Sequence, residues 1–152
     1  MPAVVQWFNE TNTSQENSWD IGPVDAGTVS TGKTFYIWNN RGGGAAVSDM
    51  TGCTITTKDS AGGNTGELVL NKWIEMKCES MNETTFSPIG GAAIRTIQAG
   101  GGAGAGVIKG TANDGTVANA VPNYAKITMH ANVPTTATAG NYAFLTRIVY
   151  QV

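Results

Sequence analysis

The sequence predicts an all-β protein, an antiparallel β-sandwich of about seven to eight strands. Short runs of alternating or β-branched residues lie between clusters of Gly, Pro, Asn and Asp. No segment combines a helical period of apolar residues with capping residues at its ends. Hydrophobic residues make up 41% of the chain, enough for a core, while only 13% are charged. The length of 152 residues suits one domain, residues 1–152.

The N-terminal part of the chain has four expected strands. They cover residues 3–8, 28–30, 33–39 and 47–57. The third is the most regular, with Phe35 and Ile37 on one face and Tyr36 and Trp38 on the other. Residues Arg41 to Gly44 end it.

The middle of the chain has weaker strand patterns. The expected strands cover residues 68–78, 94–97 and 107–109. In the first of them the apolar positions depart from a period of two, and a β-bulge near Asn71 and Lys72 would restore the alternation. A short helix is the other interpretation of this segment, although it has no capping residues.

The C-terminal third has the clearest alternation, with strands expected over residues 124–133 and 142–152. In the first, one face holds Ala125, Ile127, Met129, Ala131 and Val133. In the second, one face holds Tyr142, Phe144, Ile148 and Tyr150, and the other holds Leu145 and Val149 with Arg147. Apolar residues on both faces predict a strand that is covered on both sides, by its own domain or by a partner.

The charge distribution argues against several kinds of partner. The formal net charge is −2, from 9 basic and 11 acidic residues, and the basic residues are scattered. Nucleic-acid phosphates are held by clustered Lys and Arg, so we expect no nucleic-acid binding. No apolar run approaches the ~20 residues that span a bilayer, and the residues after Met1 lack the features of a signal peptide. We therefore expect that the chain is made in a cytoplasm and does not associate with a membrane.

Residues 27–34 match the phosphate-loop pattern GxxxxGK[ST]. A nucleotide site needs this loop to follow a buried strand and to open a helix. Here Gly22 and Pro23 precede it, and an aromatic alternation typical of a strand follows it. We interpret the segment as a turn between two strands with Gly32 at its tightest point, and we expect no cofactor.

The cysteines and the histidine offer few ligands for a metal. Cys53 and Cys78 lie in strand-like segments, where two partly buried thiols are the first interpretation and a cross-strand disulfide is the second. The single histidine, His130, cannot build a histidine-based metal site within one chain. We expect it to face solvent or a neighbouring strand, although three copies around a threefold axis could hold an ion.

No set of residues predicts catalysis. Glu75, Glu79 and Glu83 are close in sequence, but we expect a solvated edge rather than a glycosidase pair. There is also no GxSxG nucleophile motif. We therefore predict no catalytic, cofactor-binding or metal-binding residues and no enzyme activity.

Four tryptophans are candidates for the core or for stacking on sugar rings. Their usual place in a sandwich is the core. They are Trp7, Trp19, Trp38 and Trp73. Trp19 lies in a loop-like context, so it is the best candidate for an exposed contact.

Two segments resemble immunoglobulin-like sandwich proteins. Residues 21–40 contain Gly-Thr-Val followed by a strand that ends in Trp-Asn-Asn, and residues 131–142 read Ala-Asn-Val-Pro-Thr-Thr-Ala-Thr-Ala-Gly-Asn-Tyr. The second segment is similar to the V-P-x-x-A-x-x-G-x-Y/F corner that leads into the last strand of such sandwiches. Similar domains occur on tailed-bacteriophage virions as capsid decoration proteins and as tail or fibre modules. The resemblance implies an immunoglobulin-like fold and no catalytic residues.

The resemblance leads us to expect a non-enzymatic structural protein of the virion, which binds the outside of a phage capsid as a decoration or cementing protein. Its partner would be the major capsid protein or another virion protein, and a homo-oligomer such as a trimer is expected. A phage tail or fibre module and a carbohydrate-binding or adhesin sandwich are the alternatives. We expect residues 9–18 and the glycine-rich residues 100–106 to become ordered only on docking.

Overall fold

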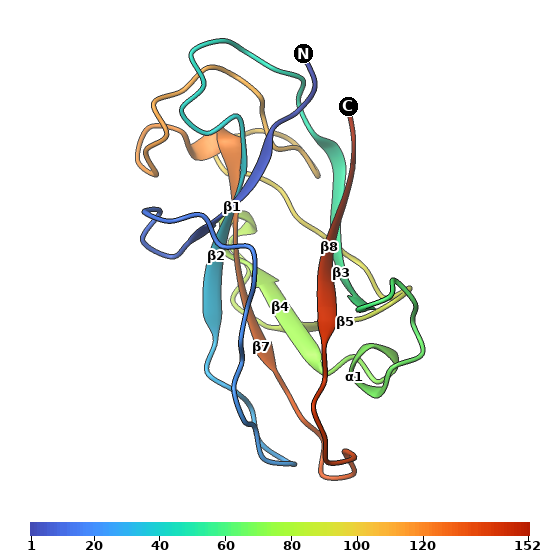
Figure 1. The fold of residues 1–152 in the computed structure, drawn as a ribbon. Coiled ribbons are helices and arrows are strands. Elements are labelled where there is room, and N and C mark those ends of the chain that lie inside the picture. Colours follow the sequence, from blue (N-terminus) through green and yellow to red (C-terminus); the bar gives the residue numbers. More distant parts are fainter.

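The computed structural model describes residues 1–152 and has two antiparallel sheets packed face to face (Figure 1). The larger sheet has the order β1 (Val5–Asn9), β2 (Lys33–Asn39), β7 (Tyr124–Ala131), β4 (Ile74–Cys78) and β5 (Ser87–Ile89). The smaller sheet has the order β6 (Arg95–Thr96), β3 (Thr51–Asp59) and β8 (Phe144–Gln151). The remaining elements are the helix α1 (Glu67–Leu70) and the 3₁₀ turns η1 (Glu79–Met81) and η2 (Val121–Asn123). No helix has the length and apolar character needed to cross a membrane.

The core lies between the two sheets and is built by the alternation that the sequence predicts. Phe35 and Ile37 of β2 point into it, as do Ile127 and Met129 of β7. Ile55 of β3 meets them from the smaller sheet, and each of these five side chains is at most 2% exposed. Because every second residue of a strand faces the same side, the pattern determines which side chains share this face.

A second, smaller cluster covers the other face of the larger sheet. It consists of Phe8, Tyr36, Trp38, Ala120 and Tyr124. The Tyr124 ring lies 5.0 Å from the ring of Tyr36 and 4.9 Å from that of Trp38. The sequence predicts that Tyr36 and Trp38 share a face, but it does not predict that loop residues bury this face.

The strand order follows the immunoglobulin fold, in which strands A to G form the sheets ABED and CFG. In this chain β1, β2, β7 and β4 lie in the order A-B-E-D, and β3 pairs with β8 as strand C pairs with strand F. β5 extends the larger sheet beyond the D position, and β6 lies on the outer side of β3. The predicted antiparallel β-sandwich is therefore confirmed, and its strand order is compatible with the immunoglobulin-like arrangement. The G position, beside the free edge of β8, holds no strand.

Several predicted strands are shorter or different in the structure. Residues 68–78 do not form one bulged strand: α1 is followed by a turn with Lys72 at a φ of 54°, and β4 begins at Ile74. The helical interpretation is correct for residues 68–70 and the strand prediction for residues 74–78. The burial of Leu68 and Val69 stabilises the short helix in the absence of a side-chain cap. The strands expected at 28–30 and 107–109 are reduced to single bridges.

The loop that leads into β8 forms a tyrosine corner, a feature of immunoglobulin-like sandwiches. The Tyr142 hydroxyl lies within hydrogen-bond distance of the Thr138 carbonyl oxygen, and it is 2.6 Å from Glu67 Oε2. The Tyr142 ring packs against Trp73 at 4.8 Å. This contact fixes where the chain turns from one sheet to the other, as the resemblance of residues 131–142 predicts.

The Glu67–Tyr142 contact is expected to make stability fall in acid. The hydrogen bond from Tyr142, followed by that from the Thr138 backbone, lowers the pKa of Glu67 below 4.5. A carboxyl with a lower pKa in the folded state stabilises the fold above its unfolded pKa, and this stabilisation is lost as the pH falls through the folded value. The test is the free energy of unfolding of the wild type and of Tyr142→Phe, at neutral pH and well below pH 4.5.

The difference between wild type and Tyr142→Phe should shrink in acid without vanishing, because the single hydroxyl proton of Tyr142 can still be donated to the Thr138 carbonyl, which does not titrate. A difference that stays constant with pH would contradict the role of Glu67. The effect is small because the pair is exposed to solvent.

Candidate functional site

The segment that matches the phosphate-loop pattern is a turn followed by a strand. The N–H groups of Gly27 and Ser30 donate to the carbonyl oxygens of Val133 and Ala131, so these donors are already occupied. β2 begins at Lys33, whose ammonium pairs with Glu16 at 2.6 Å. The predicted turn is confirmed, but its tightest point is Gly27 rather than Gly32. Gly27 has a φ of 78°, and a Cβ there would lie 2.9 Å from Thr135 Cγ2.

His130 and Glu75 form a cross-strand pair on the outer face of the larger sheet. His130 Nε2 lies 2.7 Å from Glu75 Oε1, and its ring stacks on Phe86 with 3.8 Å between centroids. This placement confirms the expected cross-strand histidine. The trimeric ion site remains a hypothesis.

The acidic residues near Glu75 bind different partners. Glu79 accepts a hydrogen bond from Thr128 and lies 3.8 Å from Lys126 Nζ. Glu83 pairs with Arg95 and accepts a hydrogen bond from the Cys78 N–H. No group of three or more His, Cys, Asp or Glu side chains is placed to hold a metal ion.

Both cysteines are free, so the disulfide interpretation is wrong and the interpretation as buried thiols is correct. Cys53 lies on β3 of the smaller sheet and Cys78 on β4 of the larger one, and neither is exposed. Burial raises the pKa of Cys53 to about 11 and also raises the pKa of Cys78. Both side chains are therefore neutral thiols that fill the core.

The tryptophans contribute to packing. Trp38 and Trp73 are buried, and Trp7 and Trp19 are half-buried. Trp19 meets Phe35 and Phe144 edge to face at 6.2 and 6.0 Å. The expectation that Trp19 is an exposed contact is therefore wrong, because one side of its ring closes the sandwich near β8.

The two loops expected to order only on docking form hydrogen bonds within the chain, and their ordering by a partner stays a prediction. In residues 9–18, the Asn9 carboxamide accepts hydrogen bonds from the N–H groups of Thr13 and Ser14. In residues 100–106, the Gly106 carbonyl accepts a hydrogen bond from the N–H of Cys53. The first loop is therefore held by hydrogen bonds within itself, and the second is bonded to β3.

The chain's own domain leaves the outer side of β8 uncovered, so of the two kinds of cover that the sequence predicts only cover by a partner remains, as a prediction. Leu145 is 48% exposed and Val149 is 50% exposed, while Phe144 and Ile148 on the inner side are half-buried. β8 is bonded on one edge only, to β3. We name the free edge of β8 together with Leu145, Arg147 and Val149 the β8 surface.

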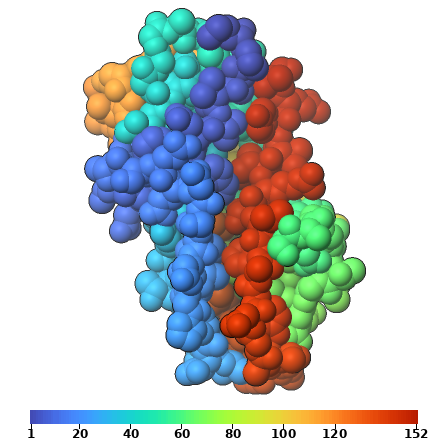
Figure 2. Space-filling model, viewed as in Figure 1, coloured from blue at the N-terminus to red at the C-terminus, as the bar shows by residue number.

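A cavity of about 260 Å³ opens beside the free edge of β8. Its apolar wall includes Trp7, Trp19, Phe35 and Phe144, and residues 16–18 form part of its polar rim. Figure 2 shows a furrow between the segment after β1, in blue, and β8, in red. Residues 17–24 run alongside β8 but make no backbone–backbone hydrogen bond. The backbone groups on this edge of β8 are therefore free.

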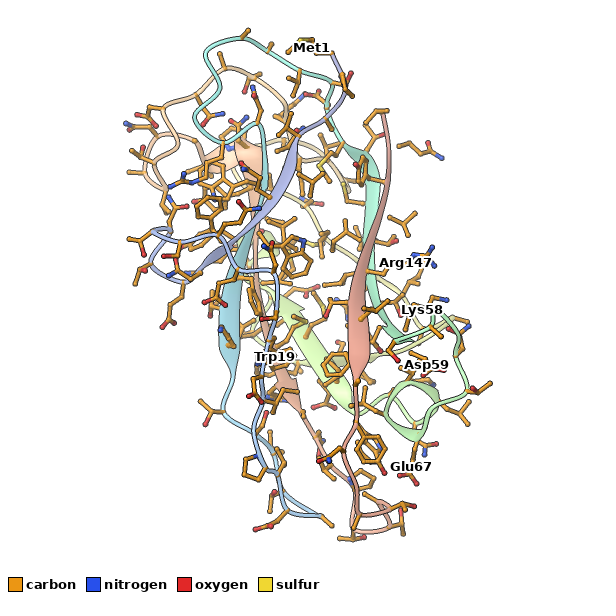
Figure 3. All side chains as sticks on the ribbon, in the orientation of Figure 1. Met1, Trp19, Lys58, Asp59, Glu67 and Arg147 are labelled. Atoms are coloured by element: carbon orange, nitrogen blue, oxygen red, sulfur yellow. The ribbon has the colours of Figure 1, made fainter.

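The β8 surface is basic as well as apolar. Arg147 of β8 and Lys58 of β3 project from the outer side of the smaller sheet (Figure 3). The register Thr56–Arg147 and Lys58–Leu145 brings them together. Neither forms an ion pair within the chain, although the Lys58 ammonium donates a hydrogen bond to Asn64 Oδ1 at 2.9 Å. The adjacent Asp59 turns its carboxylate to the N–H groups of Thr65 and Gly66. The sequence gives no sign that Lys58 belongs to this surface, because the two cations are far apart along the chain.

No protein-family model, no curated protein and no solved structure matches this chain. What is known of its surface therefore comes from its own structure.

Proposed function

We propose that this protein is a non-enzymatic structural protein of a phage virion, and that it decorates the outside of the capsid by binding the major capsid protein or another virion protein. The observation that carries the proposal is the β8 surface, an eight-residue strand with a free edge and half-exposed apolar side chains. Such edges pair readily with other chains, so monomeric proteins usually cover, shorten or charge them. The immunoglobulin-like fold and the likeness of residues 21–40 and 131–142 to virion proteins support the capsid as the partner.

The test is co-sedimentation of the purified chain with empty capsids assembled from the major capsid protein of the same genome. We expect the wild type to co-sediment and Val149→Asp to bind at least tenfold more weakly. Val29→Asp is the matched control, because Val29 is 53% exposed and lies away from β8. A wild type without affinity for capsids would overturn the proposal. Binding to purified tails alone would favour the tail or fibre alternative.

A further inference from the structure

We propose that the unpaired edge of β8 receives an extended strand from a partner protein in the G position, and that this strand carries an acidic residue between apolar residues on its outward side. This inference rests on the proposed function, since it names the kind of segment that the β8 surface binds. Addition of a strand to a free sheet edge is a common mode of peptide recognition.

The backbone of β8 provides the first part of the site. In the immunoglobulin order strand G pairs with strand F, and β8 has the F position. The backbone of residues 144–150 forms no hydrogen bond with any segment other than β3. An incoming strand can therefore pair along the free edge without breaking a ladder, but it must move aside residues 17–24, whose Trp19, Ile21 and Val24 side chains pack against the core beside β8.

The cavity provides the second part. Phe144, Thr146 and Ile148 alternate on the inner side of β8 and are half-buried. A strand in the G position would place alternate side chains over this inner face, because side chains of a strand alternate between its two sides. The aromatic wall formed by Trp7, Trp19 and Phe35 predicts that the inward side chains are apolar.

The outer side of β8 determines which charge the incoming strand can carry. Leu145, Arg147 and Val149 alternate along β8, so the outward residues of a neighbouring strand would lie opposite an apolar, a basic and an apolar side chain. Cross-strand pairs of opposite charge stabilise a sheet, and like charges directly opposite destabilise it. The unpaired cations Arg147 and Lys58 therefore favour an acidic residue in the centre of the incoming strand.

A second copy of this chain fits the same surface poorly. Pairing two β8 strands around a twofold axis would place both copies of Arg147 and Lys58 on one continuous sheet face. These like charges have no carboxylate partners within the chain to offset their repulsion. The occupant is therefore a strand of different sequence.

The probe is a short peptide fused to a soluble carrier, with apolar residues at the inward positions and Val, Glu, Val at the outward positions. Binding is followed by fluorescence anisotropy, and a set of peptides varies the inward residues among Val, Ile, Leu and Phe. We expect the Glu peptides to bind at least tenfold more tightly than matched Lys peptides. Arg147→Glu should reverse this preference, and Lys77→Glu, on the outer face of the other sheet, should leave it unchanged. A proline at the centre of the peptide should abolish binding.

Equal affinity for the Glu and Lys peptides, or no binding by any member of the set, would overturn the inference. A dimer in sedimentation that dissociates when Ile148 is replaced by proline would assign the edge to a second copy and would also overturn it. Wild-type protein that binds capsids but none of the peptides would leave the proposed function standing and refute only the incoming strand. Wild-type protein that binds the peptides but not capsids would support the incoming strand and refute the proposed function.

Discussion

Replacing Gly110 with alanine is expected to lower the free energy of unfolding by about 3 kcal/mol or more, because the added Cβ collides with backbone atoms. A Cβ at this position would lie 2.4 Å from the Val47 carbonyl oxygen and 2.6 Å from that of Ser48. The Val47 N–H also donates to the Gly110 carbonyl at 2.8 Å, so the two segments cannot separate without breaking this bond. Chemical denaturation followed by circular dichroism measures the loss.

Gly44→Ala is the matched control for Gly110→Ala. Gly44 is exposed, its φ is not positive, and a Cβ there would meet no atom within 4 Å. Alanine at such a position restricts the unfolded chain, so we expect stability to be unchanged or slightly increased. Equal stability of the two variants would show that residues 47–48 and 110 do not approach as closely as described.

Truncation of Trp38 to alanine is expected to cost ~3–5 kcal/mol and to lower the melting temperature by roughly 10 °C. Trp38 has no exposed surface and packs against Tyr124 in the cluster that covers the outer face of the larger sheet. Its Nε1–H donates to Asn12 Oδ1 at 3.0 Å. The variant loses both contacts, and thermal denaturation measures the result.

Trp19→Ala serves as the comparison for Trp38→Ala. Trp19 is only half-buried and has no hydrogen-bond partner for its indole, so its removal should cost clearly less. Trp38→Phe keeps an aromatic ring and should fall between the two alanine variants. A loss for Trp38→Ala no larger than that for Trp19→Ala would mean that the outer cluster contributes little to stability.

The central strands could be predicted because their pattern is local. In β7 every second residue is apolar, so the alternation predicts which side chains face the core. In β2 the alternation separates Phe35 and Ile37 from Tyr36 and Trp38, but both faces are apolar and both are buried. The corner before β8 was similarly visible in residues 131–142, where Tyr142 takes its expected place.

Other features depend on contacts between distant segments. The helix α1 has no cap, and its stability comes from the burial of Leu68 and Val69 by the rest of the domain. The turn at Lys72 needs a positive φ that no property of lysine predicts. The cover over Trp38 comes from loop residues such as Asn12 and Ala120, whose position is set by the whole fold.

The candidate site was partly visible in the sequence. The apolar residues on both faces of the final strand indicated that it would meet more than its own core, and Leu145 and Val149 are the residues that remain exposed. Whether the domain covers them depends on how many strands the smaller sheet has, which no local pattern states. The pairing of β3 with β8 is likewise needed to place Lys58 beside Arg147.

The sheet pairing also constrains the order of folding. Thr34 of β2 and Thr128 of β7 are hydrogen-bonded although they are 94 positions apart in the chain. β3 likewise cannot complete its pairing until β8, near the end of the chain, has been made. During synthesis only the pairings of β1 with β2, of β3 with β6 and of β4 with β5 are available before β7 has left the ribosome. Proteins dominated by such distant pairings fold in roughly milliseconds to seconds. The two sheets therefore close after most of the chain has been made. Until then the apolar faces of β2 and β3 are exposed and prone to association with other chains.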